Sequence, residues 1–232
     1  MPFGPHPHRG FETVTFILAG ELMHRDSGGH ESVIRAGGVQ WMTAGSGLVH
    51  AELSPEAFKR SGGPLEILQL WVNLPARLKM TRPRYQGLQA DRITVVETAG
   101  GKVRVALISG QWKGVTGPVD SITGNFMTTI EAMSGATLEF DGLEGRNVFL
   151  YLVGGALRVN GRDLVHHHLA ELSLAGDQLV IEATTDARLL FGHGQPINEP
   201  VIAHGPFVMN TVDEIRQAIT DYQAGKFGGV PG

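Results

Sequence analysis

Short runs of apolar and β-branched residues recur along the chain, and Gly, Pro or Asp residues separate them. Such runs predict β-strands, because branched and aromatic side chains pack well on a pleated surface. Their spacing is typical of a sandwich or barrel. The predicted strands cover residues 13–18, 65–74, 93–97, 103–109, 126–132, 148–153, 179–182 and 187–191.

The strand pattern is interrupted twice, at residues 79–89 and at residues 110–124, and both stretches are expected to be irregular. The second interruption contains Gly and Pro, and the same rhythm restarts after it. A weak internal similarity in pattern relates residues 18–42 to residues 152–181. We therefore predict two similar domains, residues 1–117 and residues 118–232.

One helix is predicted near the C-terminus. Thr211 and Glu214 have the spacing of a capping box, in which two side chains satisfy the first free N–H groups. Apolar residues follow at helical spacing, and Gly225 is a stop signal. We expect this helix to pack over a barrel rather than to recognise a partner.

Composition narrows the class of protein. The net charge of −4 argues against direct nucleic-acid binding, which normally requires a basic face. The sequence has no Cys, so a metal would have nitrogen and oxygen ligands. No apolar run approaches the length of about 20 residues that a membrane span needs. We expect a cytoplasmic protein that does not bind membranes.

Two pairs of residues with metal-binding side chains share one spacing. His6 and His8 are separated by one residue, and so are His50 and Glu52. On an extended strand, side chains two residues apart point to the same face. Two such strands placed side by side would bring three imidazoles and one carboxylate together.

This donor set suits Fe(II), Mn(II), Ni(II), Cu(II) or Zn(II) better than Mg(II) or Ca(II). Four ligands leave positions open on an octahedral metal, which is typical of a catalytic site. Taken alone, each pair is more often an ordinary surface feature than a ligand pair.

Several longer segments make the chain similar to a known family. The segments PHPHRGFETVTF, GGVQWMTAGSGLVHAE, QLWVNLP and NEPVIAHGPFVMNT resemble the signature segments of the pirin family within the cupin superfamily, in the family order. The resemblance implies an all-β bicupin with two cupin-type barrels and a short C-terminal helix. It also implies several strands before PHPHRG, which begins here at residue 5, so we expect the first barrel to lack its first strands.

The resemblance places the metal ligands on His6, His8, His50 and Glu52. Glu12 matches the Glu of the general cupin motif and, by alternation with His6 and His8, is left open as a direct or outer ligand. Four bulky residues are candidates for an aromatic pocket, although core packing is the more frequent role of such side chains: Phe11, Trp41, Met42 and Trp71.

The second half is expected to hold no metal. Its segment LEFDGLEGRN, which parallels HPH, contains no His. His166, His167 and His168 are consecutive, so neighbouring side chains would point to opposite faces of a strand, and an exposed turn is expected.

Two functions from different classes follow from the resemblance. The first is a quercetin 2,3-dioxygenase that uses one divalent metal, with Fe(II) favoured and Mn, Ni, Cu, Zn or Co as alternatives. Glu52 would be its catalytic base for a small aromatic, flavonol-like substrate. The second is a regulatory protein whose binding to transcription or metabolic proteins depends on the metal and its oxidation state. A metal-stabilised protein without catalysis is a third possibility.

Overall fold

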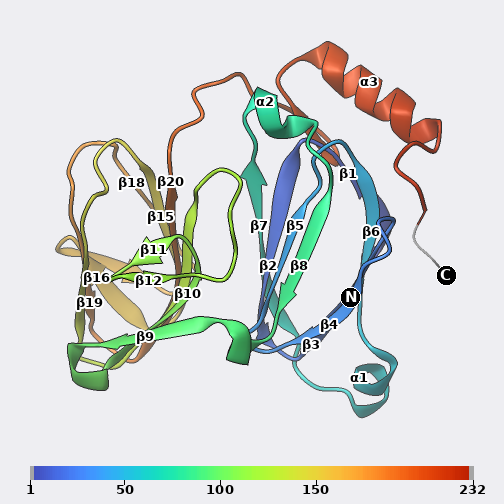
Figure 1. Ribbon diagram of the computed structural model, residues 1–232. Coiled ribbons are helices and arrows are strands. Elements are labelled where there is room, and N and C mark those ends of the chain that lie inside the picture. Colours follow the sequence, from blue (N-terminus) through green and yellow to red (C-terminus); the bar gives the residue numbers. More distant parts are fainter. Residues whose placement is uncertain (1–2, 230–232) are drawn as a thin grey trace. The chain divides into compact units, whose positions relative to one another are not determined.

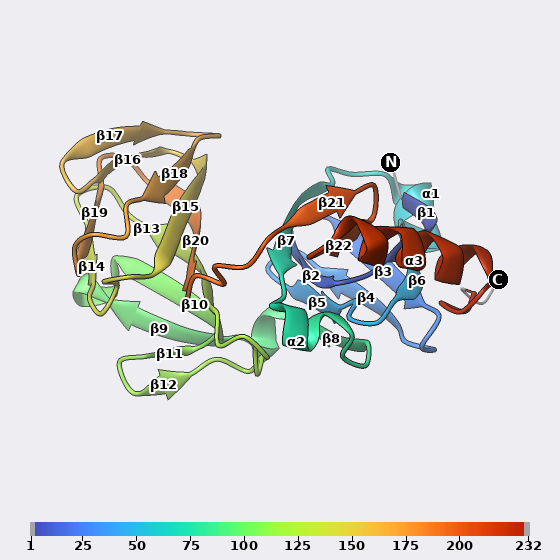
Figure 2. The same cartoon turned by 90° about the horizontal axis from the view of Figure 1, so that it is seen from above.

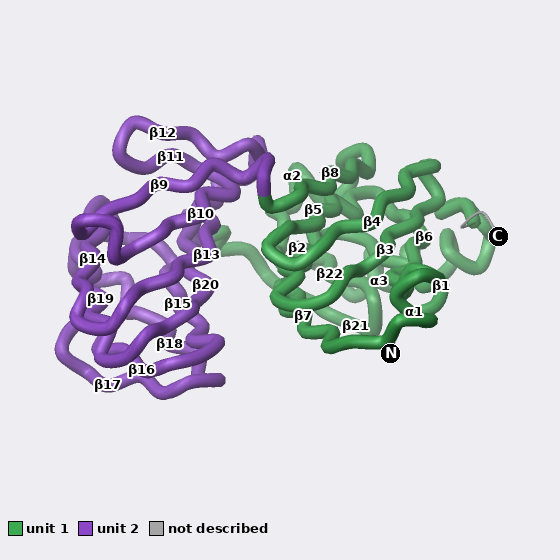
Figure 3. Tube along the Cα trace, turned by 90° about the horizontal axis from the view of Figure 1, so that it is seen from below, with its two compact units in different colours: residues 1–90, 197–232 green, residues 91–196 purple. Residues whose placement is uncertain are grey.

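The structure is a computed structural model that describes residues 3–229 (Figure 1). The chain is 52% strand and 12% helix, which confirms the all-β class expected from the sequence. Contacts divide it into two units (Figure 3). Unit 1 comprises Met1–Ala90 and Ile197–Gly232, and unit 2 comprises Asp91–Pro196.

Unit 1 contains two four-stranded antiparallel sheets, with strand orders β1-β6-β3-β4 and β7-β2-β5-β8. Its strands are β1 (Phe3–His8), β2 (Phe11–Ala19), β3 (Glu21–Asp26), β4 (Glu31–Arg35), β5 (Val39–Thr43), β6 (Leu48–Leu53), β7 (Glu66–Asn73), β8 (Arg84–Leu88), β21 (Ile202–His204) and β22 (Phe207–Met209). Its helices are α1 (Glu56–Ser61), α2 (Ala76–Lys79) and α3 (Val212–Gln223).

A bend at Gly10 moves the chain from the first sheet to the second, because β1 and β2 belong to different sheets. Gly10 has a φ of 89°, and a Cβ atom there would lie 2.0 Å from the carbonyl oxygen of Val208. Only glycine avoids both the left-handed strain and this clash. The bend therefore depends on a residue without a side chain.

The C-terminal segment returns to unit 1 and packs on its strands. Figure 2 shows α3 lying over the strands of this unit. An apolar cluster joins β6, β22 and α3: Val49, Phe207, Met209, Ile215, Ala218 and Phe227. The expected helix is confirmed, and its capping box is formed by Thr211 and Glu214.

The N-terminal and C-terminal segments of unit 1 are also joined by buried polar contacts. Arg9 Nη1 donates to Asp221 Oδ2 at 2.8 Å, which ties the end of β1 to α3. Lys79 is 1% exposed, and its ammonium donates to the carbonyl oxygens of Gly10 and Val208 and to Asn73 Oδ1. These contacts fix β22 beside the turn that follows β1.

Unit 2 contains a six-stranded sheet in the order β18-β15-β20-β13-β10-β9, a four-stranded sheet in the order β14-β19-β16-β17 and the hairpin β11-β12. Its elements are η1 (Ala90–Arg92, shared with unit 1), β9 (Thr94–Thr98), η2 (Ala99–Gly101), β10 (Val103–Ser109), β11 (Gln111–Trp112), β12 (Val115–Thr116), β13 (Phe126–Ala132), β14 (Thr137–Phe140), β15 (Asn147–Gly154), β16 (Ala156–Val159), β17 (Arg162–Val165), β18 (Leu169–Leu172), β19 (Leu179–Ala183) and β20 (Ala187–Gly194). The space between the sheets is filled by an apolar cluster that includes Leu107, Ile130, Leu150 and Phe191.

The division of the chain differs from the boundary expected near residue 117. β9 pairs with β10, and β10 pairs with β13, so the strands before residue 117 belong to the same sheet as those after it. The segment after residue 196 leaves unit 2 and returns to unit 1. Strand rhythm along the sequence does not reveal such a return, because it depends on contacts between distant segments.

Two further local expectations can be compared with the structure. Residues 79–89 were expected to be irregular, but they contain β8, which pairs with β5 from Val39↔Leu88 to Thr43↔Arg84. His166, His167 and His168 are exposed in a turn between β17 and β18, as expected. No helix among residues 3–229 is long and apolar enough to cross a membrane.

Candidate metal centre

Strands β1 and β6 bring the three predicted histidines together. They pair antiparallel, with His6 opposite His50 and His8 opposite Leu48. His6 and His8 share a face of β1 because they are two residues apart. The single residue between His6 and His8 therefore explains why their side chains lie together.

The imidazoles of His6, His8 and His50 form one compact group. One ligand nitrogen from each lies within 4.8 Å of the other two. The ring centroids of His6 and His50 are 4.3 Å apart, and those of His8 and His50 are 5.0 Å apart. This is a possible three-histidine metal site.

Hydrogen bonds to backbone carbonyls orient two of the three rings. His6 Nδ1 donates to the carbonyl oxygen of Gly4 at 2.7 Å, and His8 Nδ1 donates to that of Pro206 at 3.4 Å. A carbonyl can only accept, so each Nδ1 carries the proton and each Nε2 keeps a lone pair. Outer hydrogen bonds of this kind fix the tautomer that a metal ligand needs.

The nitrogens that face the group have no hydrogen-bond partner. His8 Nε2 and both ring nitrogens of His50 are buried and unpaired. Leaving such atoms without a partner costs free energy, so native structures normally satisfy them. A divalent cation held by His6, His8 and His50 would supply the missing partner, and the residues fit such an ion.

Burial keeps the imidazoles of His8 and His50 neutral. Desolvation, followed by the nearby His6, lowers the pKa of His8 to about 4. Desolvation, followed by the nearby His8, His6 and His24, holds the pKa of His50 far below its usual value. Metal binding requires the neutral form, so neither ring has to lose a proton near pH 7.

Glu52, the fourth predicted ligand, lies beside this group but is not part of it. Its carboxylate accepts hydrogen bonds from Thr15 Oγ1 at 3.1 Å and from Gln69 Nε2 at 2.9 and 3.0 Å. Both donors come from the opposite sheet, Thr15 from β2 and Gln69 from β7. Nothing in the sequence pointed to Gln69. Its partner, Glu52, lies on β6, and β6 belongs to a different sheet from β7.

Glu12 does not join the group either. It is fully buried, and Thr43 Oγ1 donates to its Oε1 at 2.6 Å. Burial raises the pKa of its carboxyl. The alternation argument assumed one continuous strand from His6 to Glu12, whereas the bend at Gly10 places Glu12 in the other sheet.

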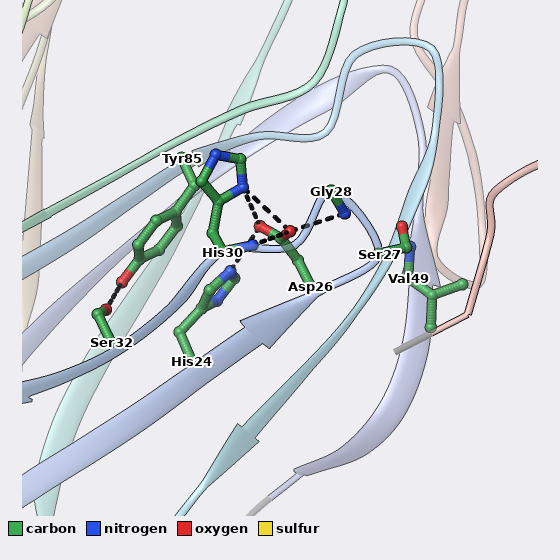
Figure 4. Close-up of polar contacts among 8 residues, drawn as sticks. All are labelled: His24, Asp26, Ser27, Gly28, His30, Ser32, Val49 and Tyr85. Atoms are coloured by element: carbon green, nitrogen blue, oxygen red, sulfur yellow. Dashed lines mark hydrogen bonds and ion pairs between the residues drawn. The ribbon is translucent and has the colours of Figure 1, made fainter. Parts of the chain in front are cut away.

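A second polar group in unit 1 was also missed. His24 and Asp26, shown close together in Figure 4, lie on β3. There Asp26 pairs with His50, and His24 pairs with Glu52. His24 Nε2 contacts Asp26 Oδ2 at 2.9 Å, and the His24 ring stacks on Tyr85 at 3.9 Å. The segment HRD has the same spacing as HPH and HAE, so a signal was present in the sequence.

The turn before β6 delivers His50. Gly45 and Gly47 both have positive φ, at 50° and 121°. A Cβ atom on Gly45 would lie 2.1 Å from the carbonyl oxygen of Thr81, and one on Gly47 would meet the ring of Phe227. The turn that delivers His50 therefore requires a residue without a side chain at both positions.

A cleft of about 380 Å³ is lined by two of the three histidines, His6 and His8, and by Glu52, Gln69 and Trp71. Trp71 is 47% exposed, and its ring contacts that of His8 at a centroid distance of 5.3 Å. Phe3, Gly205 and Pro206 complete the wall. Of the four bulky candidates, Trp71 lines the cleft, whereas Phe11, Trp41 and Met42 are buried in the core.

Both halves of the chain match family models. Residues 1–72 match the family described as Pirin, and residues 125–228 match the Pirin C-terminal cupin domain. A pirin-like protein from Caulobacter vibrioides is 44% identical over 227 residues, which cover 97% of this chain and 80% of that protein. A pirin-like protein from Solanum lycopersicum is 40% identical and covers 97% of this chain and 77% of that protein.

Solved structures share the fold. A crystal structure of quercetin 2,3-dioxygenase from Acinetobacter baumannii has a TM-score of 0.93 and 38% identity, covering 97% of this chain and 79% of that one. Bacterial pirin YhhW from Escherichia coli, in complex with nickel(II), has a TM-score of 0.68 and 23% identity, covering 84% and 77%. At that identity the second likeness concerns the fold alone.

Proposed function

The chain belongs to the pirin family of bicupins, and on this premise we propose that it is a metal-dependent dioxygenase acting on flat, flavonol-like aromatic substrates. The observation that carries the proposal is the group of unpaired, buried imidazole nitrogens of His8 and His50, next to a cleft that His6 and His8 line. A similar protein of known structure is a quercetin 2,3-dioxygenase.

In this proposal, His6, His8 and His50 hold one divalent metal, with Fe(II) as the first candidate. Imidazole nitrogens suit iron, nickel, copper and zinc alike, so the donor set supports the class of metal. When bound, the metal supplies Lewis acidity that lowers the pKa of a coordinated hydroxyl group. Three protein ligands would leave coordination positions open for a substrate.

Glu52 is the proposed general base. Its carboxylate lines the cleft and accepts hydrogen bonds from Thr15 and Gln69. A substrate hydroxyl directed at the three imidazoles would lie beside this carboxylate. Glu52 would accept the hydroxyl proton at one of its oxygens, which leaves the aromatic ring electron-rich and reactive toward dioxygen.

The walls of the cleft support a flat aromatic substrate. Trp71 presents a large exposed ring face, and Phe3 is 55% exposed on the same cleft. Aromatic rings stack with offset or edge-to-face geometry, which orients a planar ligand at little cost in flexibility. The cleft volume of about 380 Å³ falls in the range of small-molecule sites.

A second candidate function is a metal-dependent interaction with a protein partner. One contact favours it: His8 Nδ1 donates to Pro206 in the C-terminal segment, so a change at the metal would reach a surface segment. Capture of the same protein by the Fe(II) form and not by the Fe(III) form, without flavonol turnover, would favour this function over the enzyme.

The proposal is tested by aerobic incubation of the Fe(II)-loaded protein with quercetin. We expect one dioxygen consumed for each flavonol lost, and loss of the flavonol absorbance. Glu52→Gln should lower kcat by about 100-fold or more while metal binding persists, because the general base is removed. His167→Ala, a change in an exposed turn of unit 2, is the matched control and should behave as wild type. Absence of turnover with any loaded metal would refute the enzyme.

A further inference from the structure

Trp71 is held in one orientation although the residue is 47% exposed at the cleft. Its ring packs on that of Phe11 at a centroid distance of 4.4 Å and meets the His8 ring edge-on at 5.3 Å. Its indole Nε1 donates to Gln69 Oε1 at 3.2 Å. Two ring contacts and one hydrogen bond therefore hold this wall of the cleft in place.

The side-chain amide of Gln69 is hydrogen-bonded at both of its ends. Its Oε1 accepts from Trp71, and its Nε2 donates to the two carboxylate oxygens of Glu52 at 2.9 and 3.0 Å. Nε2 also donates to Thr15 Oγ1 at 3.0 Å, and that hydroxyl donates to Glu52. A continuous chain of hydrogen bonds thus runs from Trp71 through Gln69 to the carboxylate of Glu52.

The place of Gln69 in the sheet makes the second hydrogen bond important. Gln69 and Trp71 are two residues apart on β7, so their side chains lie on the same face. β7 is at the edge of its sheet, and Gln69 is an exposed residue. Fixing such a long side chain costs conformational entropy comparable with what one hydrogen bond returns. The bond from the indole therefore decides whether the amide stays beside Glu52.

The direction of the indole bond also selects the orientation of the amide. An indole N–H can only donate, so it binds the oxygen of the Gln69 amide. The NH₂ end of the amide then faces the carboxylate of Glu52, which can accept both of its protons. Water in place of the indole can donate or accept, so it would select neither orientation.

We infer that Trp71 is a positioning residue that fixes the carboxylate of Glu52 through the amide of Gln69. The ring on which the substrate would stack and the group that would accept its proton are joined by this chain. A ligand that lies flat on the indole leaves the chain intact, whereas one that displaces the indole breaks it. The link to a substrate rests on the proposed function, and the positioning of Glu52 does not.

Trp71→Phe separates the two roles of the residue, because phenylalanine retains an aromatic face and lacks the N–H. We expect the side-chain NH₂ signals of Gln69 in the ¹⁵N NMR spectrum of the metal-free protein to move toward those of a free amide. In quercetin turnover, kcat should fall about tenfold, a part of what a general base contributes, while KM stays within about threefold. A merely structural role would leave the amide signals in place.

Two further variants attribute the effect to the chain of hydrogen bonds. Gln69→Leu breaks the chain at its middle and should lower kcat to a similar extent. Trp71→Phe added to Gln69→Leu should cause no further fall in kcat, because the chain is already broken. Trp112→Phe is the matched control, since it makes the same substitution in unit 2, where Trp112 contacts Phe140. It should leave kcat, KM and the Gln69 signals unchanged.

The outcomes distinguish the positioning role from the proposed function. Unchanged Gln69 signals in Trp71→Phe, or an unchanged kcat in that variant, would overturn the inference. Effects of Trp71→Phe and Gln69→Leu on kcat that multiply independently would overturn it as well. If the wild-type protein turns over no flavonol, the proposed function fails, and the NMR comparison alone then decides the positioning role.

Discussion

The two units differ in how many polar side chains they bury. Of the 15 buried polar or charged residues among residues 3–229, 13 belong to unit 1 and two, Ser109 and Thr128, belong to unit 2. Unit 2 is filled by one large apolar cluster. Similar β-architectures thus support a mixed interior, with many buried polar groups, in unit 1 and an almost wholly apolar interior in unit 2.

This difference has a physical consequence. Burying apolar side chains stabilises unit 2 directly, whereas buried polar groups cost free energy unless each finds a partner. Unit 1 satisfies several of its polar groups with one another, as in the contacts of Glu52 with Gln69 and of Asp26 with His24. Its unpaired imidazole nitrogens remain, so we expect unit 1, and not unit 2, to be stabilised by a metal.

The largest expected effect is on unit 2. Phe191 is fully buried in its apolar cluster, so Phe191→Ala should lower the free energy of opening of β13, β15 and β20 by about 3–5 kcal/mol. Hydrogen exchange resolved by segment measures this quantity. Phe16→Ala, at a buried site on β2, is the matched control and should destabilise unit 1 instead. A change in Ni(II) affinity caused by Phe191→Ala would contradict the independence of the metal site in unit 1 from the apolar core of unit 2.

The second effect is the response of unit 1 to metal. Ni(II) at 100 times its Kd should raise the free energy of unfolding of unit 1 by about 2.7 kcal/mol, because only the folded site binds it. His50→Ala should abolish this gain. Exchange rates in β1, β3 and β6 should slow on metal addition, while those in unit 2 stay constant. Equal slowing in both units would contradict a site confined to unit 1.

The third effect is a dependence of the stability of unit 2 on pH. Burial, followed by the charge of Arg146, lowers the pKa of His193 to about 4. Between pH 6.5 and about 4 the unfolded chain therefore binds a proton that the folded chain does not, and stability falls as pH drops through this window. The loss should be about 1–2 kcal/mol in unit 2. His193→Gln should remove it, and an unchanged pH slope in that variant would exclude His193 as the cause.

The smallest effect tests the helix that covers unit 1. Thr211→Ala removes the side-chain half of the capping box of α3 and should cost about 1 kcal/mol. The loss should be confined to α3 and β22 in hydrogen exchange, because the cap belongs to unit 1. Thr211→Ser retains the hydroxyl and should restore most of the stability. A larger loss in unit 2 than in unit 1 would contradict this account of the C-terminal segment.

Much of the fold could be predicted from the sequence because it depends on local pattern. Strand rhythm and the capping box of Thr211 are properties of neighbouring residues, and the structure confirms them. The return of residues 197–229 to unit 1 depends on distant contacts, such as that of Arg9 with Asp221. No local pattern in the sequence carries that information.

In the candidate site too, features set by local spacing could be predicted from the sequence, whereas features set by contacts between distant segments could not. The grouping of His6 and His8 follows from their spacing on one strand, and the resemblance to a family added His50. The position of Glu52 depends on Gln69 and Thr15 from the opposite sheet, a pairing that spacing cannot give. Glu12 was grouped with His6 and His8 by alternation, which fails at the bend of Gly10.

The most direct test of the central claim is the metal content of the purified protein and of its His50→Ala variant, measured after saturation with Ni(II) and removal of free metal. The account predicts one ion per chain for wild type, no retained ion for His50→Ala, and one ion for the control His193→Gln in unit 2. Retention of a full equivalent of metal by His50→Ala, or loss of it in His193→Gln, would contradict a single site built from His6, His8 and His50.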